Sequence, residues 1–168
     1  MITDFNKVEC VTESSQRTFG LCDDPSPAEN PAYIDEVDGK KWIAVVENPN
    51  QYQCKFTALD HCIDSFRADG TMENRCDGVL TYNDSILFVE LKERGTKGNQ
   101  WINKAENQLR KSISFCEDAN FSKPYSRKLA YIANSEKPKE RSGQFERMNR
   151  FAKETGYVLR IQARIELL

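Results

Sequence analysis

The sequence predicts an α/β protein in which a mixed β-sheet is flanked by helices. Short segments rich in β-branched and aromatic residues alternate along the chain with segments whose apolar residues recur at helical spacing. An antiparallel pair of strands precedes strand–helix–strand connections, which favours a sheet with helices on both faces. With 168 residues, of which 39% are hydrophobic and 30% charged, the chain suits one compact domain.

The first half of the chain predicts an irregular start, a hairpin and a helix. The first thirty residues are polar and end in CDDPSPAENP, which is typical of irregular structure. The segment AYIDEVDGKKWIAVVEN predicts a hairpin that turns at Asp38-Gly39. The segment TALDHCIDSFRADG, residues 57–70, predicts a helix, because Thr57 and Asp60 fit a capping box and the following apolar residues recur at helical spacing.

The second half predicts a β-hairpin followed by alternating helices and strands. In chain order we expect strands at 75–82 and 85–92 joined by Asn83-Asp84, a helix at about 100–117, a strand at 127–134, a helix at 144–156 ending at Gly156, and a final strand at 157–167. We therefore divide the chain into residues 1–54, an irregular segment with a hairpin extension, and residues 55–168, the core. Together the two parts make one compact domain.

The N-terminal sequence and the cysteines point to the cytoplasm. The segment MITDFNKVEC lacks the basic stretch and apolar run of a signal peptide, and no apolar segment approaches the roughly 18 residues that a membrane span needs. We therefore expect a cytoplasmic protein that does not interact with membranes. In that compartment the six cysteines are expected to be reduced, and the absence of a C-x-x-C pair argues against a structural zinc site.

The charge is unevenly distributed along the chain. Residues 1–91 carry 7 Lys and Arg against 17 Asp and Glu, a net charge of −10, whereas residues 92–168 carry 17 against 9, a net charge of +8. A basic half can bind a polyanion even in a slightly acidic protein. The same distribution also suits an ordinary solvated surface, so charge alone leaves both interpretations open.

The segment RCDGVLTYNDSILFVELKERG, residues 75–95, places charged residues within two apolar strands. Because side chains alternate along a strand, Glu90 and Lys92 emerge on one face, and counting outward from the turn brings Asp77 close to Glu90. Two adjacent carboxylates repel each other unless a cation or a shared proton lies between them. Mg²⁺ or Mn²⁺ suits such oxygen ligands, so the pattern predicts metal-assisted hydrolysis of a phosphodiester.

The pattern Asp-x12-Glu-x-Lys, carried here by CDG and VELK, resembles that of the PD-(D/E)XK nuclease superfamily, over roughly residues 55–135. The resemblance implies a restriction-endonuclease-like core and DNA as the substrate. It implies that Asp77, Glu90 and the main-chain carbonyl of Leu91 bind Mg²⁺ or Mn²⁺. It also implies that Lys92 is catalytic, orienting the attacking water or offsetting charge in the transition state.

The resemblance extends to neighbouring positions. Gln108 looks like the helix glutamine that approaches the active site in many members, which makes it a fourth catalytic candidate. Cys76 replaces the eponymous proline, and Ser112 stands where members with a Gln-x-x-x-Tyr motif have tyrosine. An acidic residue of the preceding helix often adds a metal contact. Asp60 and Asp64 are both candidates, and Asp64 is the nearer to the hairpin in sequence.

Two functions from different classes remain open. The first is a Mg²⁺-dependent endo- or exodeoxyribonuclease, with Lys104 and Lys111 binding nucleic acid because they share a helical face with Gln108. The alternative is a catalytically silent nuclease-like module that binds nucleic acid or a protein partner. The short chain leaves little room for a sequence-reading domain, so we expect a homodimer or a protein partner to supply specificity.

Overall fold

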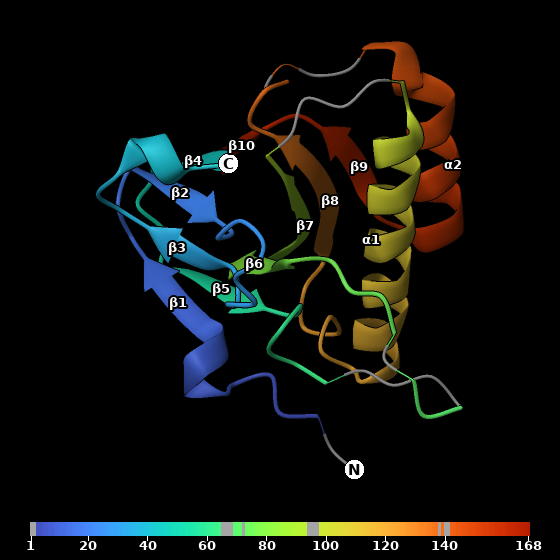
Figure 1. The fold of residues 1–168 in the computed structure, drawn as a ribbon, viewed down its shortest axis with the longest axis horizontal. Helices are drawn as coiled ribbons and strands as arrows, with labels where there is room; N and C mark the ends of the chain where they lie inside the picture. Colours follow the sequence, from blue (N-terminus) through green and yellow to red (C-terminus); the bar gives the residue numbers. More distant parts are fainter. Residues whose placement is uncertain (1–2, 65–68, 72, 94–97, 138, 140–141) are drawn as a thin grey trace.

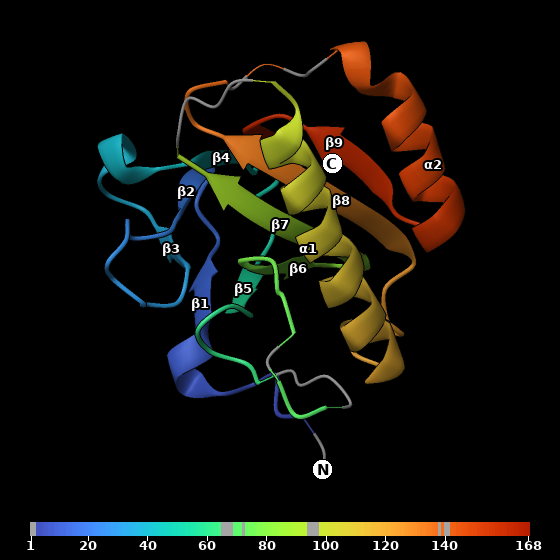
Figure 2. The ribbon, with the colours of Figure 1, turned by 45° about the vertical axis from the view of Figure 1, so that its right-hand side comes forward.

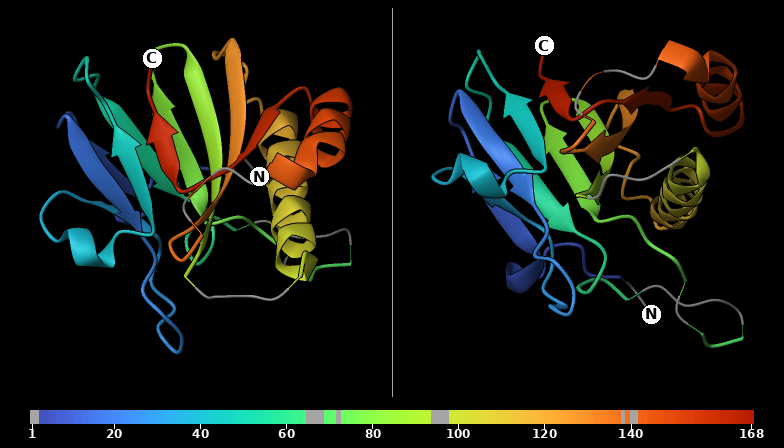
Figure 3. Two further views of the ribbon diagram at one scale, coloured as in Figure 1. Left: turned by 90° about the horizontal axis from the view of Figure 1, so that it is seen from above. Right: turned by 45° about the horizontal axis from the view of Figure 1, so that its top comes forward.

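The computed structural model describes residues 3–64, 69–71, 73–93, 98–137, 139 and 142–168. They form a mixed α/β fold of two β-sheets and two α-helices in three layers (Figure 1). The smaller sheet lies on one side of the larger sheet, and both α-helices lie on the other side (Figure 3).

The larger sheet contains six strands, and its direction of pairing changes at β7. Its order is β1 (Val11–Ser14), β5 (Cys54–Ala58), β6 (Gly78–Tyr82), β7 (Ser85–Lys92), β8 (Arg127–Asn134) and β9 (Val158–Ile161). The pairs from β1 to β7 are antiparallel, whereas β7, β8 and β9 are parallel. The carboxyl ends of the three parallel strands therefore meet at one edge, where ligands commonly bind in α/β sheets.

The smaller sheet joins strands from both ends of the chain. Its order is β10 (Arg164–Glu166), β4 (Ala44–Glu47), β2 (Thr18–Cys22) and β3 (Tyr33–Asp35). The last strand, β10, runs parallel to β4, so the N-terminal and C-terminal parts of the chain share this sheet.

The two α-helices, α1 (Gln100–Asp118) and α2 (Phe145–Thr155), pack on the same face of the larger sheet. Helix α1 lies across β7 and β8 (Figure 2). Three short 3₁₀ helices complete the described structure: η1 (Val8–Cys10), η2 (Gly39–Lys41) and η3 (Ser142–Gln144).

The expectation of helices on both faces is wrong for the described residues. Alternate apolar side chains of β6, β7 and β8 pack against the smaller sheet instead.

In the second half of the chain, the structure confirms the predicted hairpin, both predicted helices and the strand between them. Strands β6 and β7 form the expected hairpin, with Asn83 in a left-handed conformation at its turn. Helix α1 and strand β8 occupy the predicted segments. Helix α2 ends at Gly156, whose φ of 80° is the left-handed C-cap that a glycine adopts at little cost.

The predicted helix over residues 57–70 is wrong. Residues up to Ala58 belong to β5, which pairs with both β1 and β6, and a turn follows it at residues 60–63. His61 has a φ of 61°, which an α-helix does not permit. The apolar residues with helical spacing lie in this turn: Leu59 and Ile63 pack in the same core cluster, and the N–H groups of Cys62 and Ile63 both donate to the carbonyl of Leu59. Residues 65–68 lie outside the described residues.

The predicted hairpin of residues 32–48 is also wrong. Strands β3 and β4 do not pair with each other, because β2 lies between them and pairs with both. The Asp38-Gly39 pair begins the 3₁₀ helix η2 instead of a hairpin turn. Strands β1 and β2 lie within the segment predicted to be irregular. The predicted last strand, residues 157–167, is divided into β9 and β10, which belong to different sheets.

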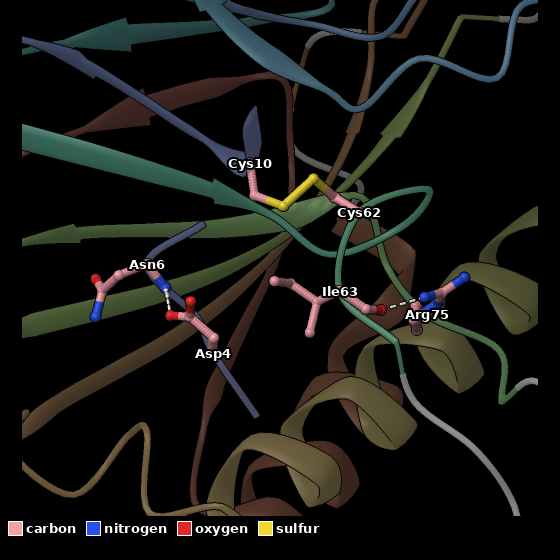
Figure 4. Close-up of a disulfide and its surroundings, with 6 residues drawn as sticks. All are labelled: Asp4, Asn6, Cys10, Cys62, Ile63 and Arg75. Atoms are coloured by element: carbon pink, nitrogen blue, oxygen red, sulfur yellow. Dashed lines mark hydrogen bonds between the residues drawn. A yellow bond between two sulfur atoms is a disulfide. The ribbon is translucent and has the colours of Figure 1, made fainter. Parts of the chain in front are cut away.

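A disulfide joins Cys10 to Cys62, which corrects the expectation that all six cysteines are reduced (Figure 4). Antiparallel pairing of β1 with β5 brings the residue before one strand close to the turn after the other, and the two Cα atoms lie 5.7 Å apart. The sequence separation is 52 residues, so only the fold brings the two thiols together. The other cysteines, Cys22, Cys54, Cys76 and Cys116, are free and buried.

Among the described residues, no helix combines the length and the apolar character needed to cross a membrane.

Gly78, the first residue of β6, allows the sheet to pack closely beside Asp77. A Cβ atom at this position would lie 2.3 Å from Cζ of the buried Phe56 ring and 2.8 Å from the carbonyl oxygen of Thr57. We expect Gly78→Ala to lower the free energy of unfolding by about 1–3 kcal/mol, because neither neighbour can move away freely. Urea denaturation measures the effect.

Gly143→Ala is the matched control, since nothing lies within 4 Å of its added Cβ. That variant should change the free energy of unfolding by less than about 0.5 kcal/mol. Equal stability of Gly78→Ala and the wild-type protein would show that β5 and β6 are packed less tightly than the structure indicates.

Candidate metal centre and its cleft

The β6–β7 hairpin brings two acidic side chains together at the carboxyl end of β7. Gly78 pairs with Val89, so the preceding residue, Asp77, lies opposite Glu90. Both are buried, with exposed fractions of 7% for Asp77 and 2% for Glu90. Burial of two carboxyl groups is unfavourable unless charge or hydrogen bonds compensate for the lost water.

Hydrogen bonds and opposite charge offset only part of the cost of burying these two carboxyl groups. Asp77 Oδ2 accepts a hydrogen bond of 2.6 Å from the main-chain N–H of Leu91. Lys92 Nζ lies 2.8 Å from Glu90 Oε2, an ion pair in which Glu90 is almost fully enclosed. Within the described residues, the buried Glu90 Oε1 has no donor. The structure thus leaves a buried carboxylate oxygen available to a cation or a proton.

The electrostatics follow from this geometry. Burial raises the pKa of Asp77 well above its ordinary value, and the charge of Glu90 and a hydrogen bond between the two carboxyl groups raise it further. Burial also raises the pKa of Glu90, although Lys92 acts in the opposite direction. A shared proton satisfies the pair in the absence of a cation. A divalent cation can replace that proton.

A third carboxyl group, Asp23, approaches from the loop that follows β2. Its carboxyl group lies close enough to that of Asp77 for the two to share a proton, and the charge of Asp60 also acts on it. Burial raises the pKa of Asp23 to about 7, with further raising by Asp77 and Asp60 and a lowering by His61. The sequence alone does not indicate Asp23, because it lies 54 positions before Asp77 in an irregular segment that carries no motif.

Of the two acidic residues considered as a further metal contact, Asp60 is the one with electrostatic links to the site. Its charge raises the pKa of both Asp23 and Glu90. It also lies 3.5 Å from the guanidinium of Arg75 and 3.4 Å from His61 Nε2. Asp64 is exposed, beyond the turn.

Helix α1 and Arg75 form hydrogen bonds that hold the segment just before Asp77 in position. Gln108 Nε2 donates a hydrogen bond of 3.1 Å to the carbonyl of Arg75, and Ser112 Oγ accepts one of 2.8 Å from the N–H of Cys76. The Arg75 guanidinium donates to the carbonyl of Ile63, next to the disulfide (Figure 4). Gln108 thus contacts the backbone that leads to Asp77, and its buried Oε1 has no partner among the described residues.

A cleft of about 870 Å³ opens beside these groups, a size typical of ligand sites. Lys92 and Leu91 line it from β7, Trp101 and Lys104 from α1, and Asp23 from the β2–β3 loop. Lys92 therefore links the buried acidic pair to the cleft.

The two lysines predicted to bind nucleic acid differ in their surroundings. Lys104 is exposed and lines the cleft. Lys111 is partly exposed and forms an ion pair of 2.9 Å with Glu73, and it is not among the residues that line the cleft. Of the two, Lys104 has the better position to contact a ligand in the cleft.

The residues present fit a hard divalent cation. Two carboxyl groups in contact, one with an unpartnered buried oxygen, are suitable ligands for Mg²⁺ or Mn²⁺, which retain several waters when bound by proteins. The contact between the Leu91 N–H and Asp77 keeps the main chain of Leu91 beside this pair. In the described part of the chain, no three or more His, Cys, Asp or Glu side chains are arranged to hold one ion directly. Solvent or main-chain oxygens would have to complete the coordination.

No protein-family model matches the chain, and comparisons with curated proteins and with solved structures also find no match. Its function must therefore be argued from the site itself.

Proposed function

We propose that the protein is a metal-dependent nuclease that hydrolyses phosphodiester bonds of DNA, with a restriction-endonuclease-like core formed by β5, β6, β7, α1 and β8. The observation that carries the proposal is the buried pair Asp77 and Glu90. Among the described residues, Glu90 Oε1 has no hydrogen-bond donor, and Lys92 Nζ lies 2.8 Å from Glu90 Oε2. Burial of such a pair costs free energy that a bound cation or a shared proton must offset, and buried groups of this kind are concentrated at functional sites.

Each residue has a defined part in the proposal. Asp77, Glu90 and the main-chain carbonyl of Leu91 would hold Mg²⁺ or Mn²⁺, which supplies charge stabilisation of the phosphodiester and a water of lowered pKa. Lys92, at the cleft, places a positive charge where negative charge develops on the phosphate. Gln108 and Ser112 hold the backbone before Asp77 in position. Lys104 contacts the flanking phosphates.

Cleavage of plasmid, duplex, single-stranded DNA and RNA in Mg²⁺ or Mn²⁺, against an EDTA control, tests the proposal. We expect cleavage of DNA that requires the metal. Asp77→Asn and Glu90→Gln should each lower the rate at least about 100-fold, because each replaces a charged oxygen ligand by a weaker neutral one.

Glu146→Gln is the control for the change of charge, since Glu146 is exposed on α2. It should cleave at the wild-type rate, and circular dichroism should show that all three variants are folded. Metal binding without cleavage of any substrate would favour the alternative, a silent nuclease-like module that binds nucleic acid or a protein partner. Cleavage that is insensitive to EDTA would contradict the proposal.

A further inference from the structure

Asp23, in the loop after β2 of the smaller sheet, lies near the candidate metal centre. It follows β2 of the smaller sheet, whereas Asp77 and Glu90 belong to the β6–β7 hairpin of the larger sheet. Its carboxyl group lies close to that of Asp77, and its side chain is partly buried. It also lines the cleft together with Lys92. The residue is therefore positioned between the buried acidic pair and the space a substrate would enter.

A second observation is that this acidic group has a buried oxygen at which a cation could bind. The side chain of Glu90 is buried, and its Oε1 has no hydrogen-bond donor within the described part of the chain. A cluster of repelling carboxyl groups could be a mere surface feature, but a buried and unpartnered carboxylate oxygen beside it requires a cation or a proton. Lys92 supplies one positive charge, at Glu90 Oε2, and leaves the other oxygen unsatisfied.

We propose that Asp23 is a positioning residue of the divalent-cation site, acting on the hydration shell of the ion that Asp77 and Glu90 bind. This inference rests on the proposed metal-dependent function and assigns a part in it to the N-terminal sheet. Within the described residues, no three or more acidic, histidine or cysteine side chains are arranged to hold one ion directly, so Asp23 is not assigned as a direct ligand. Mg²⁺ and its substitutes usually keep several waters, and carboxylates that bind such waters strengthen the site.

Asp23→Asn tests the proposal, with Asp24→Asn as its matched control. The asparagine amide can still donate a hydrogen bond to Asp77, so the orientation of Asp77 is retained while the charge is lost. Asp24 is adjacent in sequence, and its carboxylate accepts hydrogen bonds from Tyr33 and Asn30. The two variants have the same net charge, so their long-range electrostatic effects are comparable.

Isothermal titration with Mn²⁺, in the absence of substrate, is the primary measurement. We expect Asp23→Asn to weaken Mn²⁺ binding about 10–100-fold, the usual effect of losing a partner of the first coordination shell. Asp24→Asn should bind Mn²⁺ as the wild-type protein does. A cleavage assay gives a second readout, since the Mn²⁺ concentration needed for half-maximal rate should rise by the same factor while the rate at saturating Mn²⁺ stays within a few-fold of wild type.

The outcomes separate this inference from the proposed function. Suppose that Asp23→Asn binds Mn²⁺ with wild-type affinity and Asp77→Asn does not bind it. That result would overturn the role of Asp23 and leave the two-carboxylate site intact. An equal loss in Asp24→Asn would overturn it too, because the effect would then be general electrostatics. A wild-type protein that does not bind Mn²⁺ would overturn both.

Discussion

Lys92→Ala should lower the rate of DNA cleavage about 10²–10³-fold at saturating Mg²⁺, the usual cost of removing one positioned electrostatic group from an active site. Lys92 Nζ lies 2.8 Å from Glu90 Oε2, and the residue lines the cleft. The proposed reaction adds negative charge to the phosphate at this place. The pairing with Glu90 fixes the ammonium group before the substrate arrives, so little reorganisation is needed.

The same variant should also affect stability, because Lys92 is the cation that neutralises the buried Glu90 carboxylate. Without it we expect the metal-free protein to lose about 1–3 kcal/mol of unfolding free energy at neutral pH. Saturating Mn²⁺ should restore part of that loss. Rates must therefore be compared at equal metal occupancy, measured by titration.

Lys153→Ala is the control, since Lys153 is exposed on α2. It should retain both the wild-type rate and the wild-type stability. A wild-type cleavage rate in Lys92→Ala, at equal metal occupancy, would remove Lys92 from the mechanism.

The stability of the metal-free protein should fall by a few kcal/mol, on the order of 2–4, as the pH rises from about 4 to about 7. The folded-state pKa of Asp23 is raised to about 7, and those of Asp77 and Glu90 are also raised. Between the unfolded and folded pKa values, the folded protein binds more protons than the unfolded chain. Stability therefore decreases with pH across that window and levels off above the folded pKa.

A divalent cation should reverse this trend, because it replaces the protons that the acidic group releases. We expect Ca²⁺ or Mg²⁺ to raise the melting temperature by several degrees at pH 8 and by much less at pH 5. Thermal denaturation at both pH values, with and without the cation, measures the difference.

Asp23→Asn should reduce the pH dependence, since it removes the group whose pKa is raised to about 7. An equal effect of the cation at the two pH values would show that the carboxyl groups do not release protons when the ion binds. A metal-free protein that becomes more stable from pH 5 to pH 7 would contradict the raised pKa values.

Local sequence was most informative where neighbouring residues make the structure. The β6–β7 hairpin could be predicted because a turn at Asn83-Asp84 sets its register, and that register alone places Asp77 opposite Glu90. Helix α1 and the glycine cap at Gly156 were also predicted, since helical periodicity and a C-terminal glycine are local signals.

The same local reasoning failed where strand pairing decides the structure. Residues 57–63 have helical spacing, yet they form the end of β5, which pairs with β1 and β6, and a single turn in which Cys62 and Ile63 donate to the carbonyl of Leu59. Strand β2 lies in a segment interpreted as irregular, and it separates the two strands expected to form a hairpin. Pairing partners that are distant in sequence overrode the local pattern in both places.

The sequence by itself determined the acidic pair, its lysine and the hairpin that carries them, because all three depend on a register set within sixteen residues, Asp77 to Lys92. Only the tertiary structure decided that Asp23 reaches Asp77, that the Cys10 and Cys62 thiols meet, and that Gln108 contacts the Arg75 carbonyl. Each of these contacts joins residues 33 to 54 positions apart. Their proximity depends on how the two sheets and α1 pack, and no local pattern of residue types specifies that arrangement.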